Sequence, residues 1–131
     1  MEIAIKEHSI DLQPILKNIT QYEEEKCTIV HCRYASRSSY NSIRIWLSTY
    51  LIEESNVRRK LIKAFNIPMM PETILCKPVN GFCHFTLVFE GLSKDCSSFH
   101  LLEDIPESGG FYSTTIERNK TDVYNVEVKC L

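Results

Sequence analysis

Four stretches of the chain alternate between hydrophobic and polar residues, which is the pattern of a strand with one buried face. They cover residues 27–34, 43–51, 84–89 and 123–128. The side chains expected to point inward from the first two stretches are Thr28, Val30, Cys32 and Tyr34, followed by Ile43, Ile45, Leu47 and Leu51. The chain is therefore predicted to be mainly β.

Turn-forming residues separate these stretches. Clusters of small and polar residues, which typically reverse the chain, occupy positions 36–42, 53–56 and 107–110. Three prolines, Pro68, Pro71 and Pro78, exclude a long helix between residues 66 and 81. About seven or eight short strands at this spacing predict an all-β domain built as a sandwich or a small barrel.

Two segments have helical spacing instead. In residues 11–20 the apolar side chains lie three and four positions apart, with Asp11 placed to cap a helix and Pro14 in its first turn. A short helix is expected there. Residues 57–65 have similar spacing, but Arg58 to Lys60 interrupt the apolar stripe. For 57–65 we favour an extended conformation, with a helix as the alternative.

Composition narrows the class of protein. The 131 residues predict a single domain, 1–131, and the net charge is −2. Nucleic-acid binders normally carry excess Lys and Arg, so no nucleic acid is expected as a partner. The basic run Arg58–Lys60 with Lys63 is expected to be a solvated face. No membrane-length apolar stretch and no signal-like N-terminus occur. The sequence predicts a cytoplasmic protein, or an exported one if a leader preceding Met1 was removed.

The cysteines are numerous for this length: Cys27, Cys32, Cys76, Cys83, Cys96 and Cys130. Without an export signal, buried free thiols that act as small hydrophobic side chains are expected rather than disulfides. A structural zinc site needs paired ligands from tight turns. Cys27-x₄-Cys32 is the nearest approach to such a pair, and Cys96-x₃-His100 lacks an obvious second pair. No metal site is assigned.

Catalytic motifs are absent from the sequence. A cysteine nucleophile needs a neighbouring base, but adjacent residues such as His31 and Cys32 leave a strand on opposite faces. The same holds for Cys83 and His84. A Gly-x-Ser-x-Gly elbow, a His-Glu-x-x-His motif and a phosphate loop are all missing. One acidic cluster is expected to be a solvated loop before Gly109: Glu103, Asp104 and Glu107. No catalytic residue and no cofactor are assigned.

One long pattern extends over the middle of the chain. Its parts are Thr49-Tyr50-Leu51, Asn66-Ile67-Pro68, the run from His84 to Asp95 and the run from Ser98 to Glu103. The pattern resembles a group of poorly characterised bacterial domains that stand alone or precede thioredoxin-like domains in exported proteins. The resemblance implies an immunoglobulin-like antiparallel β-sandwich over roughly residues 27–128, with 57–65 extended. It brings no catalytic residues, and the absence of a Cys-x-x-Cys motif leaves no redox role to carry over.

Several aromatic residues have two candidate roles. Residues 119–126 are similar to the tyrosine corner of immunoglobulin-like domains. In that motif a tyrosine at the start of a late strand, here Tyr124, forms a hydrogen bond with the upstream backbone. A plain core or exposed tyrosine is the alternative. Trp46 is expected in or near the core, although its place in the alternation opposes Ile43. Four aromatic residues of expected loops either close the sandwich ends or anchor a protein partner: Tyr40, Phe82, Phe111 and Tyr112.

Together these patterns predict a non-enzymatic β-sandwich module with an interaction or accessory role. Its expected partner is another protein or a second copy of the chain, paired through an edge strand. The alternative is a small thiol- or metal-dependent enzyme whose cysteines and histidines gather only in the folded chain. Thiol reactivity and metal content distinguish the two hypotheses.

Overall fold

A computed structural model describes residues 26–131 of the chain. Within these residues there are ten strands: β1 (Thr28–Ala35), β2 (Asn41–Ile43), β3 (Thr49–Glu53), β4 (Arg58–Phe65), β5 (Ile74–Cys76), β6 (Phe82–Phe89), β7 (Ser98–Glu103), β8 (Phe111–Tyr112), β9 (Ile116–Glu117) and β10 (Val123–Cys130). The all-β prediction is confirmed for this part of the chain. It contains no helix long and apolar enough to cross a membrane. The helix expected at 11–20 lies outside the described residues.

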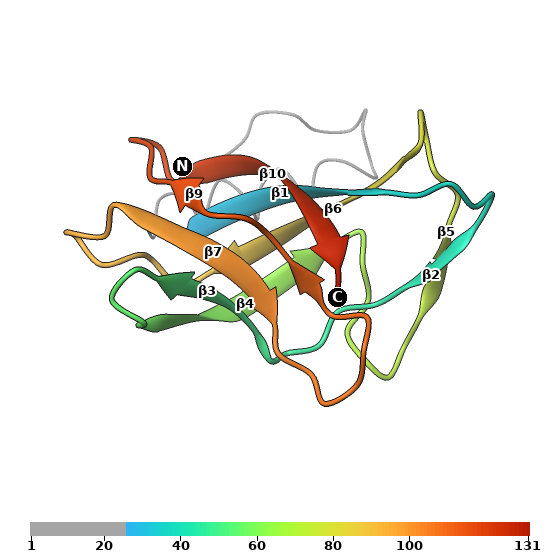
Figure 1. The fold of residues 1–131 in the computed structure, drawn as a ribbon, viewed down its shortest axis with the longest axis horizontal. Coiled ribbons are helices and arrows are strands. Elements are labelled where there is room, and N and C mark those ends of the chain that lie inside the picture. Colours follow the sequence, from blue (N-terminus) through green and yellow to red (C-terminus); the bar gives the residue numbers. More distant parts are fainter. Residues whose placement is uncertain (1–25) are drawn as a thin grey trace, which may run out of the picture.

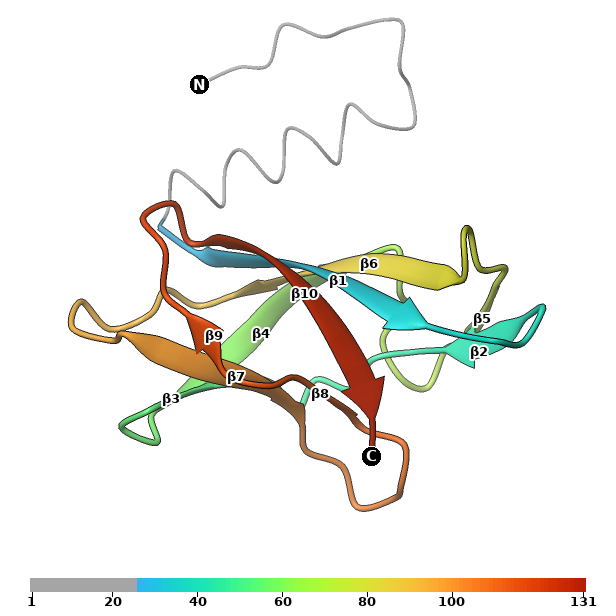
Figure 2. The same cartoon turned by 45° about the horizontal axis from the view of Figure 1, so that its top comes forward.

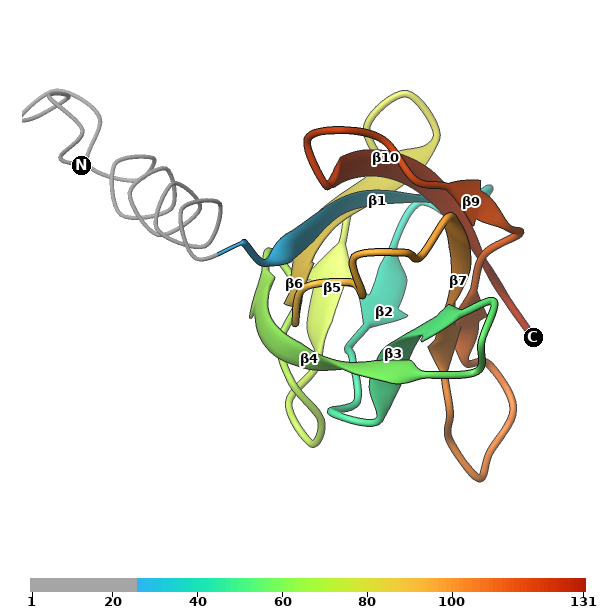
Figure 3. The same cartoon turned by 90° about the vertical axis from the view of Figure 1, so that its left-hand side faces the viewer.

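Seven of the strands form a closed ring in the order β3-β4-β6-β1-β10-β8-β7, and the pairing of β7 with β3 completes it. Figure 3 shows this ring end-on. Neighbouring strands are antiparallel except β1 and β10, which are parallel. A ring with an odd number of strands must contain a parallel pair, because strictly alternating directions match around a circle only when the number is even. β9 pairs with the same edge of β7 as β8 does, nearer the beginning of β7.

The strands therefore close into a barrel-like sheet and do not separate clearly into the two layers of a sandwich. Closure pairs most strand edges within the ring. The immunoglobulin-like topology that the resemblance implies is not confirmed by this arrangement. The extended conformation favoured for residues 57–65 is confirmed, because β4 pairs with β3 on one side and with β6 on the other.

Alternate side chains from the strands fill the interior of the ring. The largest fully buried ones include Phe85, Phe89, Phe99, Leu51, Leu87 and Leu101. In β1 the predicted alternation is confirmed, since Val30 and Cys32 belong to this core and Tyr34 packs against it. A second, smaller apolar cluster contains Ile29 and Val88. Because neighbours in a strand face opposite ways, this cluster lies on the outer face of the sheet.

The stretch 43–51 is not one continuous strand. β2 ends and β3 begins on either side of a turn that contains Leu47. Leu47 is 68% exposed, so its expected inward position is wrong. The other side chains of the expected inward set are buried: Ile43, Ile45 and Leu51. The break also removes the conflict over Trp46, which is half-buried and belongs to no strand.

β2 and β5 form a separate two-stranded ribbon at one end of the ring. Figures 1 and 2 show the ribbon beyond the C-terminal end of β1 and the beginning of β6. An isolated parallel bridge joins Ile45, just after β2, to Met69, which precedes β5. Ile43 and Ile45 belong to the main core, so the ribbon is anchored by burial of its inner side chains.

Charged side chains hold the opposite end of the ring. The Glu53 carboxylate is buried and accepts hydrogen bonds from Arg59 Nε (2.8 Å) and from the Ser93 backbone N–H (2.9 Å). Arg59 is thus half-buried, which corrects the expectation that the whole run 58–60 is a solvated face. Arg118 pairs with Asp122 at 3.1 Å nearby. This end is therefore closed by polar contacts, whereas the ribbon occupies the other.

The tyrosine-corner prediction is confirmed at the start of β10. Tyr124 is buried, and its hydroxyl accepts a hydrogen bond from the upstream Asn119 backbone N–H at 3.1 Å. The same hydroxyl donates to Asp122 Oδ1 at 2.8 Å. The hydroxyl therefore fixes the turn that leads into β10.

Candidate functional site

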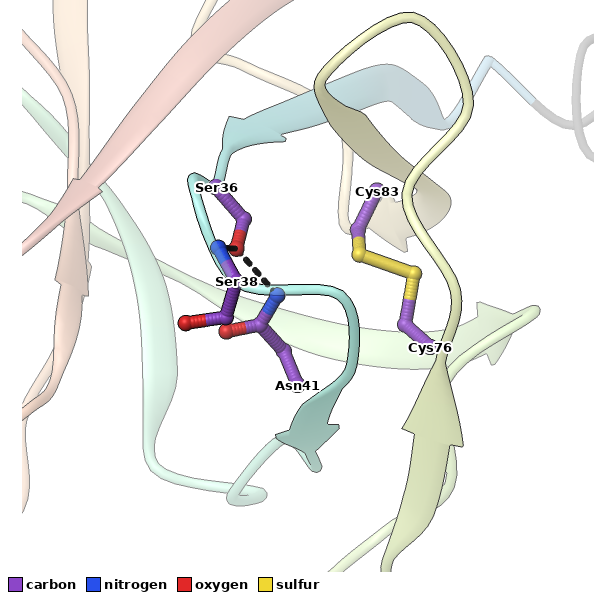
Figure 4. Close-up of a disulfide and its surroundings, with 5 residues drawn as sticks. All are labelled: Ser36, Ser38, Asn41, Cys76 and Cys83. Atoms are coloured by element: carbon purple, nitrogen blue, oxygen red, sulfur yellow. Dashed lines mark hydrogen bonds between the residues drawn. A yellow bond between two sulfur atoms is a disulfide. The ribbon is translucent and has the colours of Figure 1, made fainter.

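A disulfide joins the ribbon to the ring. Cys76 of β5 and Cys83 of β6 are bonded, with their Cα atoms 6.2 Å apart (Figure 4). The expectation that all six cysteines are free thiols is therefore wrong for these two. Between them, Asn80 and Gly81 both have positive φ angles of 53° and 84°. An Asn-Gly pair favours a tight two-residue hairpin, and this signal in the sequence could have placed the two cysteines close together.

The loop from β1 to β2 folds beside the disulfide. The Ser36 hydroxyl accepts hydrogen bonds from the Ser38 backbone N–H and from the Asn41 side-chain amide (Figure 4). The Ser36 backbone N–H donates to the Gly81 carbonyl at 2.9 Å. Both strands of the ribbon are therefore tied to the end of the ring, β2 through this loop and β5 through the disulfide.

The ribbon exposes apolar side chains to solvent. Ser42 and Leu75 are directly opposed in the pairing of β2 with β5 and therefore share a face. Ile43 lies on the other face and is buried, so Leu75 points outward and is 69% exposed. Further large exposed apolar side chains lie in the ribbon or within three residues of it: Tyr40, Ile74 and Val79. Ile74 is opposed to Ile43 and so lies on the other face of the ribbon, which leaves Leu75 as the apolar side chain on the outward face of β5.

The four aromatic residues considered as partner anchors have different environments. Tyr40 is exposed, as an anchor requires. Phe82, Phe111 and Tyr112 lie in strands and not in loops. Phe111 is buried, and its ring centroid lies 5.4 Å from that of Phe85 in the core. Among the four, Tyr40 is therefore the residue available to a partner.

A pocket of about 230 Å³ adjoins β2 at the ribbon end of the ring. Its lining includes Asn41 to Arg44, Trp46, Tyr34, Glu103, Glu107, Phe111 and Cys130. The pocket and β2 thus share a wall, because Asn41, Ser42 and Ile43 belong to both.

Glu103 is the buried charged group of this pocket. Glu103 is only 3% exposed. The expectation that it lies in a solvated loop is therefore wrong for this residue. Oε2 accepts a hydrogen bond from the Trp46 backbone N–H (2.8 Å), and Oε1 accepts one from the Phe111 backbone N–H (2.9 Å). The alternation from Phe99 through Leu101 predicts an inward position for the next odd-numbered residue. That alternation is the signal by which the sequence could have located Glu103.

The environment of Glu103 disfavours its charged form. Burial raises the pKa of Glu103 and outweighs the two backbone hydrogen bonds and the nearby Arg44, which lower it. Among the described residues, Glu103 takes part in no ion pair. Arg44 instead pairs with Glu107 at 4.0 Å. Two carboxylates and one guanidinium therefore line the pocket.

Three of the cysteines outside the disulfide have raised pKa values. Burial raises the pKa of Cys96 to about 11, and the charges of Glu53 and Glu54 add to the effect. Burial also raises the pKa of Cys32 and of Cys130, which lines the pocket. Because the thiolate is the reactive form, these three thiols are poor nucleophiles at neutral pH.

The candidate metal ligands do not converge. No group of three or more His, Cys, Asp or Glu side chains in residues 26–131 is arranged to hold a metal ion. Cys96 Sγ donates to the Ser98 carbonyl at 3.3 Å, whereas His100 lies on the outer face of β7, since its neighbours Phe99 and Leu101 are buried. The pair with zinc-like spacing is therefore not assembled.

The adjacent cysteine–histidine pairs face opposite ways, as expected from strand geometry. Cys32 is buried in the core, while His31 Nδ1 lies 2.8 Å from Thr86 Oγ1. Cys83 is buried and His84 is exposed. Neither pair brings a thiol against an imidazole.

A larger hollow of about 460 Å³ lies over β6, β1 and β10. Two of its charged side chains already neutralise each other, since Arg33 and Glu127 form an ion pair of 3.3 Å. The hollow also contains His31, which is bonded to Thr86. The carboxylate of this hollow is thus paired with a guanidinium, in contrast to the buried carboxylate beside the ribbon.

Comparison with known proteins finds no matching protein-family model, no matching curated protein and no matching solved structure. The resemblance to the bacterial domain family therefore stays a prediction.

Proposed function

We propose that this protein is a non-enzymatic interaction module that binds an extended segment of a partner protein at the ribbon formed by β2 and β5. The observation that carries the proposal is the outward Leu75, exposed on a ribbon that a disulfide ties to the ring. The immunoglobulin-like and bacterial assignments belong to the same proposal, and their support is the sequence pattern between His84 and Glu103.

The ribbon has the features required for addition of a strand. Within the described residues, β2 and β5 pair only with each other, so each retains an outer edge. An extended segment that pairs with such an edge gains main-chain hydrogen bonds, and neighbouring apolar side chains supply specificity. The disulfide and the Ser36 loop hold the ribbon in place before binding, which lowers the entropy lost on association.

Selection of peptides from a random display library tests the proposal. Peptides are selected on the native protein and then measured against Leu75→Asp. The selected peptides should bind this variant at least about tenfold more weakly, because a charge replaces the central apolar contact. Leu47→Asp is the matched control, since Leu47 is 68% exposed and Leu75 69%. It should leave the affinity unchanged.

A second matched pair repeats the comparison at branched side chains. Ile74 in the ribbon is 44% exposed and Ile62 in β4 is 43% exposed, so Ile74→Asp should weaken binding and Ile62→Asp should not. Equal affinity of the selected peptides for native protein, Leu75→Asp and Ile74→Asp would overturn the proposal. A stable dimer in light scattering that Leu75→Asp dissociates would also overturn it, because a second copy and not a partner protein would then occupy the ribbon.

A further inference from the structure

The Glu103 carboxylate at the ribbon end is enclosed, and among the described residues no cation forms an ion pair with it. It is 97% shielded from solvent, since only 3% of the residue is exposed, and its hydrogen-bond donors are two neutral backbone N–H groups. A buried carboxylate normally takes a cationic partner, because desolvation of an unpaired charge is unfavourable. The guanidinium that lines the same pocket, that of Arg44, is instead 4.0 Å from Glu107. The charged lining of the pocket therefore consists of two carboxylates and one guanidinium, which complements a positive group.

The size of the pocket limits what can enter. At about 230 Å³ it lies below the roughly 300–1,000 Å³ typical of sites for drug-sized ligands. It has room for a single long side chain but not for a large cofactor. Its wall includes Ser42 and Ile43 of β2, so a strand docked on the outer edge of β2 carries its side chains past the opening.

We infer that the pocket between β2 and Glu103 receives one lysine or arginine side chain from the partner segment that docks on the ribbon. The inference rests on the proposed function and specifies its partner as an extended, apolar segment that contains a basic residue. Trp46, Glu107 and Arg44 also line the pocket. The aliphatic stem of a basic side chain contacts such a wall, while its charged head reaches the carboxylate.

Three capped peptides test the inference by NMR titration of the full chain. The first is acetyl-Val-Thr-Lys-Thr-Val-amide, and the others carry norleucine or glutamate in place of lysine. The lysine peptide should bind at least about tenfold more tightly than either. It should also shift the amide signals of Trp46 and Phe111, because these N–H groups donate to Glu103. Equal affinities of the lysine and norleucine peptides would overturn the inference.

Exposed charges at the pocket provide variants that leave the buried carboxylate in place. Arg44→Gln removes the competing cation and should tighten binding of the lysine peptide roughly two- to fivefold, while Glu107→Gln should weaken it by a similar factor. Arg33→Gln and Glu127→Gln alter a comparable ion pair on the outer face of the sheet and should change nothing. Identical affinities for Arg44→Gln and Glu107→Gln would contradict the inference.

Two further outcomes separate this inference from the proposed function. If n-butylammonium binds as tightly as the lysine peptide and shifts the same two amides, the pocket takes a small amine, and the inference of a partner side chain fails. If display-selected peptides depend on Leu75 but contain no shared basic residue, the ribbon binds a partner without use of the pocket. The proposed function then stands and the inference fails. In the converse result, the lysine peptide is still preferred but binding does not depend on Leu75. The proposed function then fails.

Discussion

The backbone N–H of Trp46 donates a 2.8 Å hydrogen bond to Oε2 of Glu103, a residue 57 positions later in the chain. The second oxygen of the same carboxylate accepts a hydrogen bond from Phe111 at the start of β8. One side chain thus joins the break between β2 and β3 to the end of β7 and the beginning of β8. The geometry of the ribbon end depends on this carboxylate.

Replacement of Glu103 by leucine should destabilise the protein by roughly 2–4 kcal/mol, because two buried N–H groups lose their acceptor. Urea unfolding followed by fluorescence of Trp46 measures the change. Glu107→Leu serves as the control, since Glu107 is exposed and its loss should alter the free energy of unfolding by no more than about 0.5 kcal/mol. Equal stability of the Glu103→Leu variant and the native protein would rule out the joining role.

Glu103 should also make stability depend on pH. Burial raises its pKa in the folded protein, against the opposing effects of Arg44 and the two N–H donors and with a small contribution from Glu107. Between the ordinary carboxyl pKa of about 4.3 and this raised value, the folded state binds a proton that the unfolded chain releases. The corresponding stability is present below the unfolded pKa and is lost as pH rises through the folded pKa.

The measurement compares the free energy of unfolding of the native protein with that of Glu103→Gln across this range. The difference should shift in favour of the native protein as pH falls from 7, because protonation removes the buried charge. Cys130, whose pKa is raised, titrates above this window. A difference that does not vary between pH 7 and the ordinary carboxyl pKa would contradict the assignment.

Glu53, at the other end of the ring, should behave in the opposite way. Burial opposes its ionisation, but the hydrogen bonds from Ser93 and Arg59 outweigh burial and lower its pKa. The stability that this carboxylate contributes is present above the unfolded pKa and is lost as pH falls through the folded pKa. The native protein should therefore lose its advantage over Glu53→Gln in acid. If the stability advantage of the native protein instead grows on acidification, the hydrogen bonds from Ser93 and Arg59 are not its cause.

Reduction of the Cys76–Cys83 disulfide should lower the free energy of unfolding by about 2–3 kcal/mol, because the short loop that it closes is no longer constrained in the unfolded chain. Thermal unfolding with and without a dithiol reductant measures this loss. The Cys76→Ser, Cys83→Ser double variant provides the control, and the reductant should leave its melting temperature unchanged. A reductant effect of equal size in the double variant would assign the loss to another cysteine.

The hydroxyl of Tyr124 should contribute about 1–2 kcal/mol to stability, since it exchanges hydrogen bonds with Asn119 and Asp122 in a buried position. Tyr124→Phe removes the hydroxyl and keeps the ring, which packs edge-on against Phe99. Chemical denaturation should show the loss, whereas Tyr40→Phe at an exposed ring should be neutral. A neutral Tyr124→Phe would leave only the ring as the stabilising element.

Periodicity along the chain predicted the individual strands well. The extended conformation of residues 57–65 is confirmed too, although their apolar spacing is helical and the family resemblance implied the strand. The stretches around Val30, Phe85 and Val126 all form strands. These predictions succeed because a strand with one buried face imposes a two-residue period on its own side chains. The tyrosine corner is equally local, since Tyr124 and Asn119 lie five residues apart.

The candidate site depended on contacts that periodicity does not encode. Glu103 was expected in solvent because acidic residues surround it, yet its position at the end of β7 turns it inward. Leu47 was expected in the core, but it lies in a turn that interrupts the expected strand. Glu103 is buried because it continues the alternation of Phe99 and Leu101. Leu47 is exposed because it lies in a turn and not in a strand.

The amino-acid sequence by itself determined that this chain is mainly β, where most strands lie and which side chains of β1 face the core. Only the tertiary structure decided that β3 pairs with β7 and β1 with β10, so that the sheet closes. It also decided that Glu103 meets Trp46. The physical reason is distance along the chain: alternation records whether a side chain is buried, but not which distant strand buries it.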